Sequence, residues 1–281
     1  MKKALRLLLF VPLALFCGCG DDPAPAGETI DCQASQFILS ASGFQPSTVT
    51  VGLNGNKITS INGAGLAIAF THAGDSVTYI SNNRKEVAFS EGGKVVRHEI
   101  KPANPGTGAR IENRILGTFV YNGSQLTKVV YKNYNFSFGP TNNSISTTQL
   151  NSTEYTFKYD ASGNLTAVDH TLIPAGGGAV PNAYKTMLLT YTNKAMPRSG
   201  TVPFFNAYTE IFESYVLAFN TQIKLFKNIP ATFGYTDRSQ NPVQVGAFTY
   251  TPTVDAAGNI TKLLEVTTSR TFTYDYTYKC P

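Results

Sequence analysis

The chain has 281 residues, a formal net charge of +5 and 42% hydrophobic residues. Residues 1–18 hold three of the 23 basic residues and none of the 18 acidic ones, which leaves +2 for the remainder. Because this net charge is close to zero, we do not expect nucleic acid or an acidic membrane surface as a partner. No composition break divides the remainder, so we expect a single domain over residues 30–281 with a proper core.

The N-terminus has the pattern of a secretory leader. A basic start precedes ten apolar residues, Leu7 to Phe16. This stretch is too short to span a bilayer as a helix and has the length of a signal-peptide core. It ends at Cys17-Gly18-Cys19, and a small residue directly before a cysteine resembles the lipobox of bacterial lipoproteins. We expect a lipoprotein signal peptide over residues 1–18 and lipidation of Cys19, with palmitate among its acyl chains. Cys17 is the alternative anchor, and an ordinary signal peptide is the alternative leader.

Residues 19–29 have the composition of a flexible tether, because Pro, Ala, Gly and acidic residues follow one another without an apolar period. Acidic residues just after Cys19 resemble the surface-export signals of Bacteroidota lipoproteins, and a plain solvated spacer is the alternative. We therefore expect a protein that is lipid-anchored to the outer membrane, with the bilayer as its partner through acylated Cys19. The periplasmic and surface leaflets both stay open.

Five stretches repeat one plan: an extended arm, a Gly-containing turn, and an aliphatic residue two or three positions after the glycine. They cover residues 51–61, 89–100, 119–131, 156–170 and 251–266. Gly, Asn and Asp supply the positive φ of a tight turn, and Val, Ile, Thr, Tyr and Phe suit the arms of a hairpin. The irregular spacing excludes a strict solenoid. It predicts a mainly β fold with one large, curved antiparallel meander sheet, open or half-barrel-like.

The aliphatic residues of a repeat stand three positions apart, as in Leu165 and Val168. In a regular strand this spacing places them on opposite faces. Either both faces of the sheet are partly covered or a β-bulge intervenes. The sequence leaves both explanations open.

One segment departs from the β pattern. Over residues 206–220 apolar residues recur at helical spacing, acidic residues come early, and Lys224 and Lys227 come late. We expect one amphipathic helix here, with Asn206 as its cap. Its aromatic stripe is expected to pack into the core, with a ligand-lining role as the alternative. The stripe is Tyr208, Ile211, Phe212, Tyr215 and Phe219.

Residues that carry chemistry are few and scattered. The three histidines, His72, His98 and His170, have no close spacing to one another or to acidic residues, so neither a metal site nor a cofactor is expected. Asp160, Asp169 and Asp255 lie in or beside expected turns, where Asp caps the backbone. No G-x-S-x-G elbow is present. We therefore expect no enzymatic activity.

Two covalent features are expected in the mature chain. Once Cys17 is cut away and Cys19 carries lipid, Cys32 and Cys280 are the remaining thiols, and an oxidising compartment favours a disulfide between them. Such a bond would join the two ends of the domain. An open sheet with distant ends is the alternative. Asp75-Ser76-Val77 resembles the short O-glycosylation signal of Bacteroidota, which marks Ser76 as a candidate site.

The phrase YDASGNLT at residues 159–166 is similar to the YD repeats of the Rhs type. The lipobox, the repeated hairpins, LFKNIPATFGYTD at 225–237 and the ending FTYDYTYKC at 272–280 extend this likeness. Together they resemble Bacteroidota lipoproteins of the domain of unknown function 4595 family. The resemblance implies a large, strongly curved antiparallel sheet, and it brings no known catalytic residue or ligand.

The expected function is a cell-envelope lipoprotein, monomeric, that acts as a non-catalytic binding or scaffold module. The alternative is an enzyme or a glycan-binding accessory that acts on an envelope or extracellular polysaccharide. A third reading, an integral outer-membrane barrel, fits the aromatic strands. It fits the ending YKCP less well, because this lacks the terminal aromatic residue expected for barrel insertion.

Overall fold

The computed structural model describes residues 32–55, 57–81, 83–177, 184–196, 202–218, 223–239 and 241–279. Residues 31–281 form one compact unit. No helix in the described ranges is long and apolar enough to cross a membrane.

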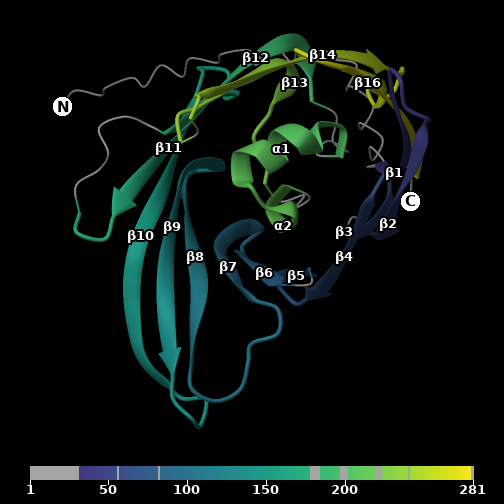
Figure 1. Cartoon of the computed structure of the whole chain (residues 1–281). Helices are drawn as coiled ribbons and strands as arrows, with labels where there is room; N and C mark the ends of the chain where they lie inside the picture. The colour runs from purple at the N-terminus through teal and green to yellow at the C-terminus, as the bar shows by residue number, and fades with distance from the viewer. Residues whose placement is uncertain are drawn as a thin grey trace, which may run out of the picture. The chain divides into compact units, whose positions relative to one another are not determined.

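Sixteen antiparallel strands form a closed barrel, with each strand beside its neighbours in the chain (Figure 1). The strands are β1 (Gln33–Ala41), β2 (Ser47–Asn54), β3 (Lys57–Gly63), β4 (Leu66–Ala73), β5 (Ser76–Ile80), β6 (Arg84–Glu91), β7 (Lys94–Pro102), β8 (Arg110–Asn122), β9 (Gln125–Phe138), β10 (Ser144–Tyr159), β11 (Leu165–Pro174), β12 (Lys185–Ala195), β13 (Asn228–Asp237), β14 (Gln244–Val254), β15 (Ile260–Thr267) and β16 (Thr271–Lys279).

The mainly β fold is confirmed, but the expected open or half-barrel sheet is wrong. β1 pairs with β16, so that Gln33 lies opposite Lys279 and Phe37 lies opposite Tyr276. Closure gives the first and last strands a partner and removes the two free edges that an open sheet would expose. Among the described residues, every ladder of the barrel and every residue of its core lie between Gln33 and Lys279.

Short helices lie inside the ring of strands (Figure 1): the 3₁₀ turn η1 (Val202–Phe204), α1 (Phe205–Phe212) and α2 (Tyr215–Ala218). The expected single helix over 206–220 is therefore wrong. α1 ends at Glu213, whose φ of 51° is left-handed. The Ser214 hydroxyl then accepts the N–H of Leu217 and begins α2. Asn206 is not the cap, because Phe204 occupies the N-cap position of α1.

The five predicted hairpins are confirmed, and a bulge explains their aliphatic spacing. In the β10–β11 hairpin, Lys158 lies opposite Ala167 but Tyr159 lies opposite Leu165, which leaves Thr166 without a partner in the ladder. Leu165 and Val168 consequently both point into the barrel, and both are fully buried. The same position is bulged in each of the five hairpins, at Thr59, Val96, Thr127, Thr166 and Thr261.

Hydrogen bonds at the bulge account for the Thr and Tyr of the repeat. The bulged threonine donates to a carbonyl of the partner strand in three hairpins: Thr127 to Val120, Thr166 to Lys158 and Thr261 to Thr253. The carbonyl of the preceding aliphatic residue accepts a tyrosine hydroxyl from the next strand. These pairs are Tyr121 with Val95, Tyr159 with Leu126, Tyr191 with Leu165 and Tyr278 with Ile260, at 3.0, 2.8, 2.5 and 2.8 Å. The Thr and Tyr of the repeat thus supply hydrogen bonds to backbone carbonyls at the bulge.

Along β14 and β16 the lumen side is aromatic and the outer side is polar, although the outer wall also exposes apolar side chains such as Leu188 and Val245. Along β16, Tyr274 and Tyr276 point inward and are buried, whereas Asp275 and Thr277 between and after them are exposed. β14 alternates in the same way, with buried Tyr250 flanked by exposed threonines. A transmembrane β-barrel has the reverse arrangement, an apolar band outside and a polar interior.

Candidate functional site

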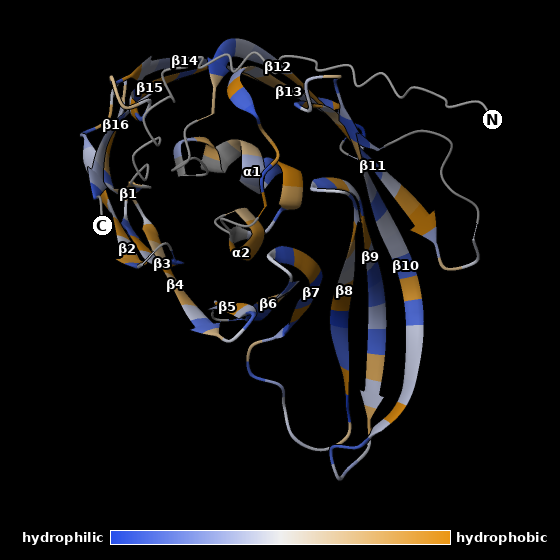
Figure 2. Cartoon of the chain, turned by 180° about the vertical axis from the view of Figure 1, so that it is seen from behind, coloured by the Kyte–Doolittle hydropathy of each residue, from blue (hydrophilic) through white to orange (hydrophobic). Residues whose placement is uncertain are grey.

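β8, β9 and β10 project beyond the neighbouring strands (Figure 2). β7 pairs with β8 only over residues 115–118 of β8, and β11 pairs with β10 only from Asn151 onward. The far parts of the three strands therefore pair only with one another. Residues 144–150 at the outer edge of this projection are all exposed.

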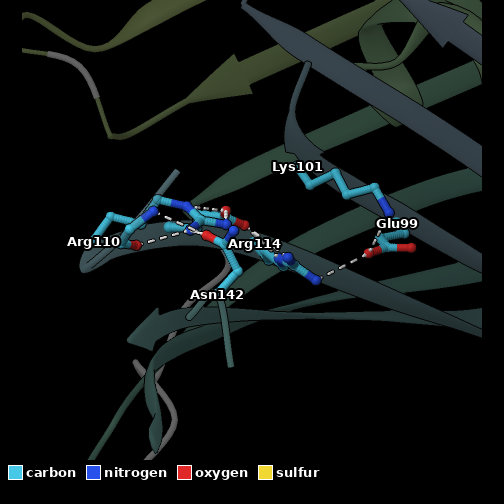
Figure 3. A network of polar contacts seen from close by, with 7 residues as sticks. Glu99, Lys101, Arg110, Arg114 and Asn142 are labelled. Atoms are coloured by element: carbon cyan, nitrogen blue, oxygen red, sulfur yellow. Dashed lines mark hydrogen bonds and ion pairs between the residues drawn. The ribbon is translucent and has the colours of Figure 1, made fainter. Parts of the chain in front are cut away.

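An ion-pair network stiffens the outer face of the projection (Figure 3). Glu112 is almost completely buried, and its carboxylate accepts Arg110 at 2.6 Å and Arg114 at 2.7 Å. Both guanidinium groups also lie over the Phe138 ring, at 4.3 and 5.3 Å from its centroid. Burial opposes the charge on Glu112, but the hydrogen bonds from Arg114 and Arg110 outweigh it and hold the pKa of that carboxyl below its usual range.

The charged groups of this network are paired with one another. Arg110 further donates to the Asn142 side chain at 2.6 Å, and Arg114 lies 3.9 Å from Glu99, which Lys101 also contacts. Because the guanidinium groups already hold carboxylates and carbonyl oxygens of the chain, the network braces the projection and leaves little cationic surface for a ligand.

A second polar cluster lies inside the barrel, at the turn between α1 and α2. The Ser214 hydroxyl donates to Glu86 at 2.5 Å, and His98 Nε2 lies 3.6 Å from the same carboxylate oxygen. The other ring nitrogen of His98 is 3.1 Å from the Tyr131 hydroxyl. Arg84 contacts the second Glu86 oxygen at 2.8 Å. The cluster therefore ties the helix turn to β6, β7 and β9.

The charges of this cluster follow from burial and contacts. Burial opposes ionisation of Glu86, but the close contact with His98, the hydrogen bond from Ser214 and the charge of Arg84 hold its pKa below the usual value. Burial lowers the pKa of His98, with Glu86 opposing the shift only in part. Burial also lowers the pKa of His170 to about 3, aided by the charge of Lys185. Both histidines are therefore neutral at pH 7.

The interior cluster has the residue types of an active site but not the arrangement. In a hydrolytic triad the histidine lies between the serine and the carboxylate, whereas Ser214 here contacts Glu86 directly. Glu86, His98 and Ser214 are all less than 4% exposed, so the described residues enclose them. Among the described residues no group of three or more His, Cys, Asp or Glu could hold a metal ion. The cluster fastens the helices to the wall.

One accessible concave site is a pocket of about 520 Å³, named here the rim pocket. It lies at the turns of the β6–β7, β8–β9 and β10–β11 hairpins, beside residues 223–227. Its apolar lining includes Tyr121, Leu126, Tyr159 and Phe226. Lys94, Lys224 and Lys227 also line it, and no acidic residue is among its described lining. The rim pocket is thus an apolar cup bordered by cations.

The hairpin at residues 160–164 positions one wall of the rim pocket. Asn164 is 3% exposed, and its side-chain oxygen accepts the backbone N–H groups of Lys227 and Asn228, at 3.2 and 2.8 Å. Asp160 holds Asn164 in turn, by accepting its backbone N–H at 2.8 Å. The sequence pattern singled out this hairpin as a turn but gave no sign of its contact with Lys227, more than 60 residues later.

Several predicted site residues stand apart from the rim pocket. Ser76 begins β5 beside an exposed turn, and its hydroxyl donates to Ala73; its glycosylation stays a prediction. Asp169 was expected in or beside a turn, and this is wrong, because it lies within β11 and pairs with Lys158 on the outer wall. Cys19 lies outside the described residues, as does Cys280, so lipidation and the Cys32–Cys280 disulfide also stay predictions. Gln33, the residue after Cys32, pairs with Lys279, so β1 and β16 lie side by side at this end of the ladder.

The helical aromatic stripe is core where the structure describes it. Tyr208, Ile211 and Phe212 are at most 2% exposed. The Tyr208 hydroxyl accepts the N–H of Leu225, which fixes α1 to the segment behind the rim pocket. The expected core role is therefore confirmed for these three residues, and the ligand-lining alternative stays untested. The side chains of Tyr215 and Phe219 lie outside the described part.

Comparisons with known proteins show similarity of fold alone. No protein-family model and no curated protein matches the chain, so the resemblance to the domain of unknown function 4595 family stays a prediction. A solved structure of a porin-like protein from Bacteroides vulgatus ATCC 8482 is similar, with a TM-score of 0.55 and 13% identity, over 89% of this chain and 99% of that one. A porin-like protein from Bacteroides uniformis ATCC 8492 matches with a TM-score of 0.42 and 15% identity, over 88% and 98%. The described residues share the barrel architecture of the first of these.

Proposed function

We propose that the chain is an envelope lipoprotein, lipid-anchored to the outer membrane, whose closed barrel is a non-catalytic binding module and not a channel. The filled lumen is the observation that carries this proposal. The Phe204 ring lies edge-on to Tyr250 of the wall, with centroids 5.3 Å apart, and Phe212 lies 6.0 Å from Phe157. Among the described residues, helices and wall thereby form one continuous hydrophobic cluster that occupies the interior of the barrel, which speaks against an open channel.

The polarity of the wall favours a barrel that stands in water. Lys158 pairs with Asp169, and Lys262 lies 3.7 Å from Asp275, on outward faces of the strands. A charged residue on a lipid-facing strand costs about 2–4 kcal/mol at the bilayer midplane. The membrane is therefore reached through the acylated Cys19 and the tether at residues 19–29, and the barrel extends from it. The enclosure of Ser214 and His98 supports a function without catalysis.

Conductance tests the barrel part of the proposal. The purified protein is added to planar bilayers, with a general outer-membrane porin as the positive control. We expect no conductance steps, because the lumen is filled with side chains. Reproducible steps that disappear when the protein is omitted would show that the barrel conducts, and the filled-module proposal would be wrong.

Metabolic labelling tests the anchor. Cells that express the full chain are labelled with a palmitate analogue, and Cys19→Ser is compared with Cys17→Ser as the matched control. We expect Cys19→Ser to lose the label and leave the membrane fraction, while Cys17→Ser keeps both. Loss of label only in Cys17→Ser would show that Cys17 is the anchor. Absence of label from the wild-type chain and from both variants would refute lipidation.

A further inference from the structure

We propose that the rim pocket binds an anionic amphiphile, a molecule with an apolar chain and one carboxylate. This inference rests on the binding function proposed above and names the class of its ligand. It follows from the shape of the pocket, from the separation of its apolar floor and cationic border, and from the contacts that hold the border in place.

The floor suits an apolar chain. A volume of about 520 Å³ lies within the range of small-molecule sites. Leu126 and Phe226 are 2% and 6% exposed, so they form a packed base. The hydroxyl groups of Tyr121 and Tyr159 already donate to the carbonyls of Val95 and Leu126. The two rings therefore offer the pocket their apolar faces while their polar ends are satisfied.

The border suits one anion. Lys224 and Lys227 are exposed, and no acidic residue shares the described lining. Lys94 donates to the Gly123 carbonyl at 2.7 Å and adds a third positive charge beside the Tyr121 ring. Ammonium groups form charge-assisted hydrogen bonds with carboxylates, and several positive charges around a concave site attract an anion to it. A neutral apolar ligand would leave these cations without a role.

The backbone of one border lysine, Lys227, is positioned before a ligand arrives. Gly163 lies directly beside Lys227, and a Cβ at Gly163 would come within 2.8 Å of the Lys227 Nζ. The bond from Lys227 N–H to the buried Asn164 side chain fixes the backbone of that lysine. A pre-positioned group loses less conformational entropy on binding, so a modest pocket can bind with useful affinity.

Dodecanoate, below its micelle-forming concentration, is the probe. Isothermal titration uses residues 31–281, the compact unit that holds every ladder and core residue the structure describes. We expect saturable binding at one site per chain. The double variant Lys224→Gln/Lys227→Gln should weaken binding about ten-fold or more, because two charge-assisted contacts are lost. The matched control Lys132→Gln/Lys262→Gln removes the same charge from the outer wall and should bind as the wild type does.

Two further ligands separate the parts of the proposal. Decyl maltoside has an apolar chain with a neutral head, and acetate has a carboxylate without a chain. We expect neither to compete with dodecanoate at equal concentration, and we expect raised salt to weaken dodecanoate binding. Equal competition by decyl maltoside would show that the charge does not matter, and equal binding by both double variants would place the site elsewhere. Either result, or no binding of dodecanoate, overturns the proposal.

The outcome is independent of the tests of the proposed function. Conductance and palmitate labelling do not involve the rim pocket, so a barrel that fails to bind dodecanoate but is anchored and non-conducting refutes only the ligand class. A conducting or unlabelled protein that still binds dodecanoate through Lys224 and Lys227 refutes the proposed function and leaves the pocket standing.

Discussion

The hairpin turns at residues 160–164 and 255–259 have nearly the same sequence, DASGN and DAAGN, and the same local geometry. In each, the aspartate accepts the backbone N–H of the asparagine at 2.8 Å and its side-chain amide at 3.3 Å. Gly163 and Gly258 have φ of 83° and 88°, which confirms the predicted positive φ. Local sequence alone thus specifies the turn.

The two turns differ in what they touch. The buried Asn164 side chain accepts two backbone N–H groups from residues 227 and 228. Asn259 is only half-buried, and within the described structure its side chain bonds only to Asp255 of its own turn. A Cβ added to Gly258 would meet no heavy atom within 4 Å, whereas one at Gly163 would meet Lys227. The comparison shows that one module can serve as a plain turn or as the support of a pocket, and that only its surroundings decide.

The largest test of this difference is the loss of the asparagine side chain. Asn164→Ala leaves two N–H groups of a partly buried segment without an acceptor, and it should lower the free energy of unfolding by about 2–4 kcal/mol. Asn259→Ala loses only the bond within the turn and should cost about 1 kcal/mol or less. Urea unfolding of both variants measures the difference, with Asn259→Ala as the matched control. Equal costs would mean that the contact with Lys227 contributes nothing to stability.

A second test changes the glycines. Gly163→Val and Gly258→Val should each cost about 1–2 kcal/mol, since a β-branched residue is poorly suited to positive φ. Thermal or urea unfolding should therefore give similar losses of stability. Only Gly163→Val should also weaken dodecanoate binding, because its side chain displaces the Lys227 amine. Unchanged melting of both variants would show that neither turn needs its glycine, and equal binding would remove Gly163 from the pocket.

The hairpins illustrate how far the sequence reaches. The turn glycines, the capping role of Asp160 and Asp255 and the extended arms are determined within a few residues, so pattern and propensity predict them. The choice between a bulge and two covered faces needed the ladder register, although the Thr that usually follows the aliphatic residue was a usable signal. It recurs at the unpaired position in four of the five hairpins.

Most features that depend on distant contacts were not predictable. Closure rests on the pairing of β1 with β16, at opposite ends of the domain; the expected Cys32–Cys280 bond implied that these ends meet, but no local pattern indicated a closed barrel. The break at Glu213 directly precedes Ser214, which bonds to Glu86 across 128 positions of the chain. The rim pocket combines three hairpins with residues 223–227. The helical spacing of apolar residues predicted one continuous helix over residues 206–220. This spacing is hardly changed when a single residue between two helices adopts a left-handed conformation.

A third test concerns a property that the two turns should share. The backbone N–H of Asn164 lowers the pKa of Asp160, with help from the other N–H groups of the turn, and Asn259 does the same for Asp255. The folded turn thus favours the ionised carboxyl, so its stabilising effect is full above the ordinary pKa of 3.8 and is lost as the pH falls through the folded value. NMR titration should place both carboxyls below 3.8 with similar curves. A normal pKa at either aspartate would show that its turn is not formed in solution.

The smallest expected effect comes from exchanging the one residue by which the turns differ. Ser162→Ala and Ala257→Ser each convert one turn into the sequence of the other. Both positions are exposed, and the N–H of Ser162 that supports Asp160 belongs to the backbone and survives the change. Each substitution should therefore alter the free energy of unfolding by no more than about 0.5 kcal/mol, as is usual for surface positions. Ser162→Ala should also bind dodecanoate as the wild type does, and Ala257→Ser should not make its turn a binding element. A loss well above this limit in Ser162→Ala alone would mean that the serine hydroxyl, and not the surroundings of Asn164, distinguishes the turn that supports the pocket.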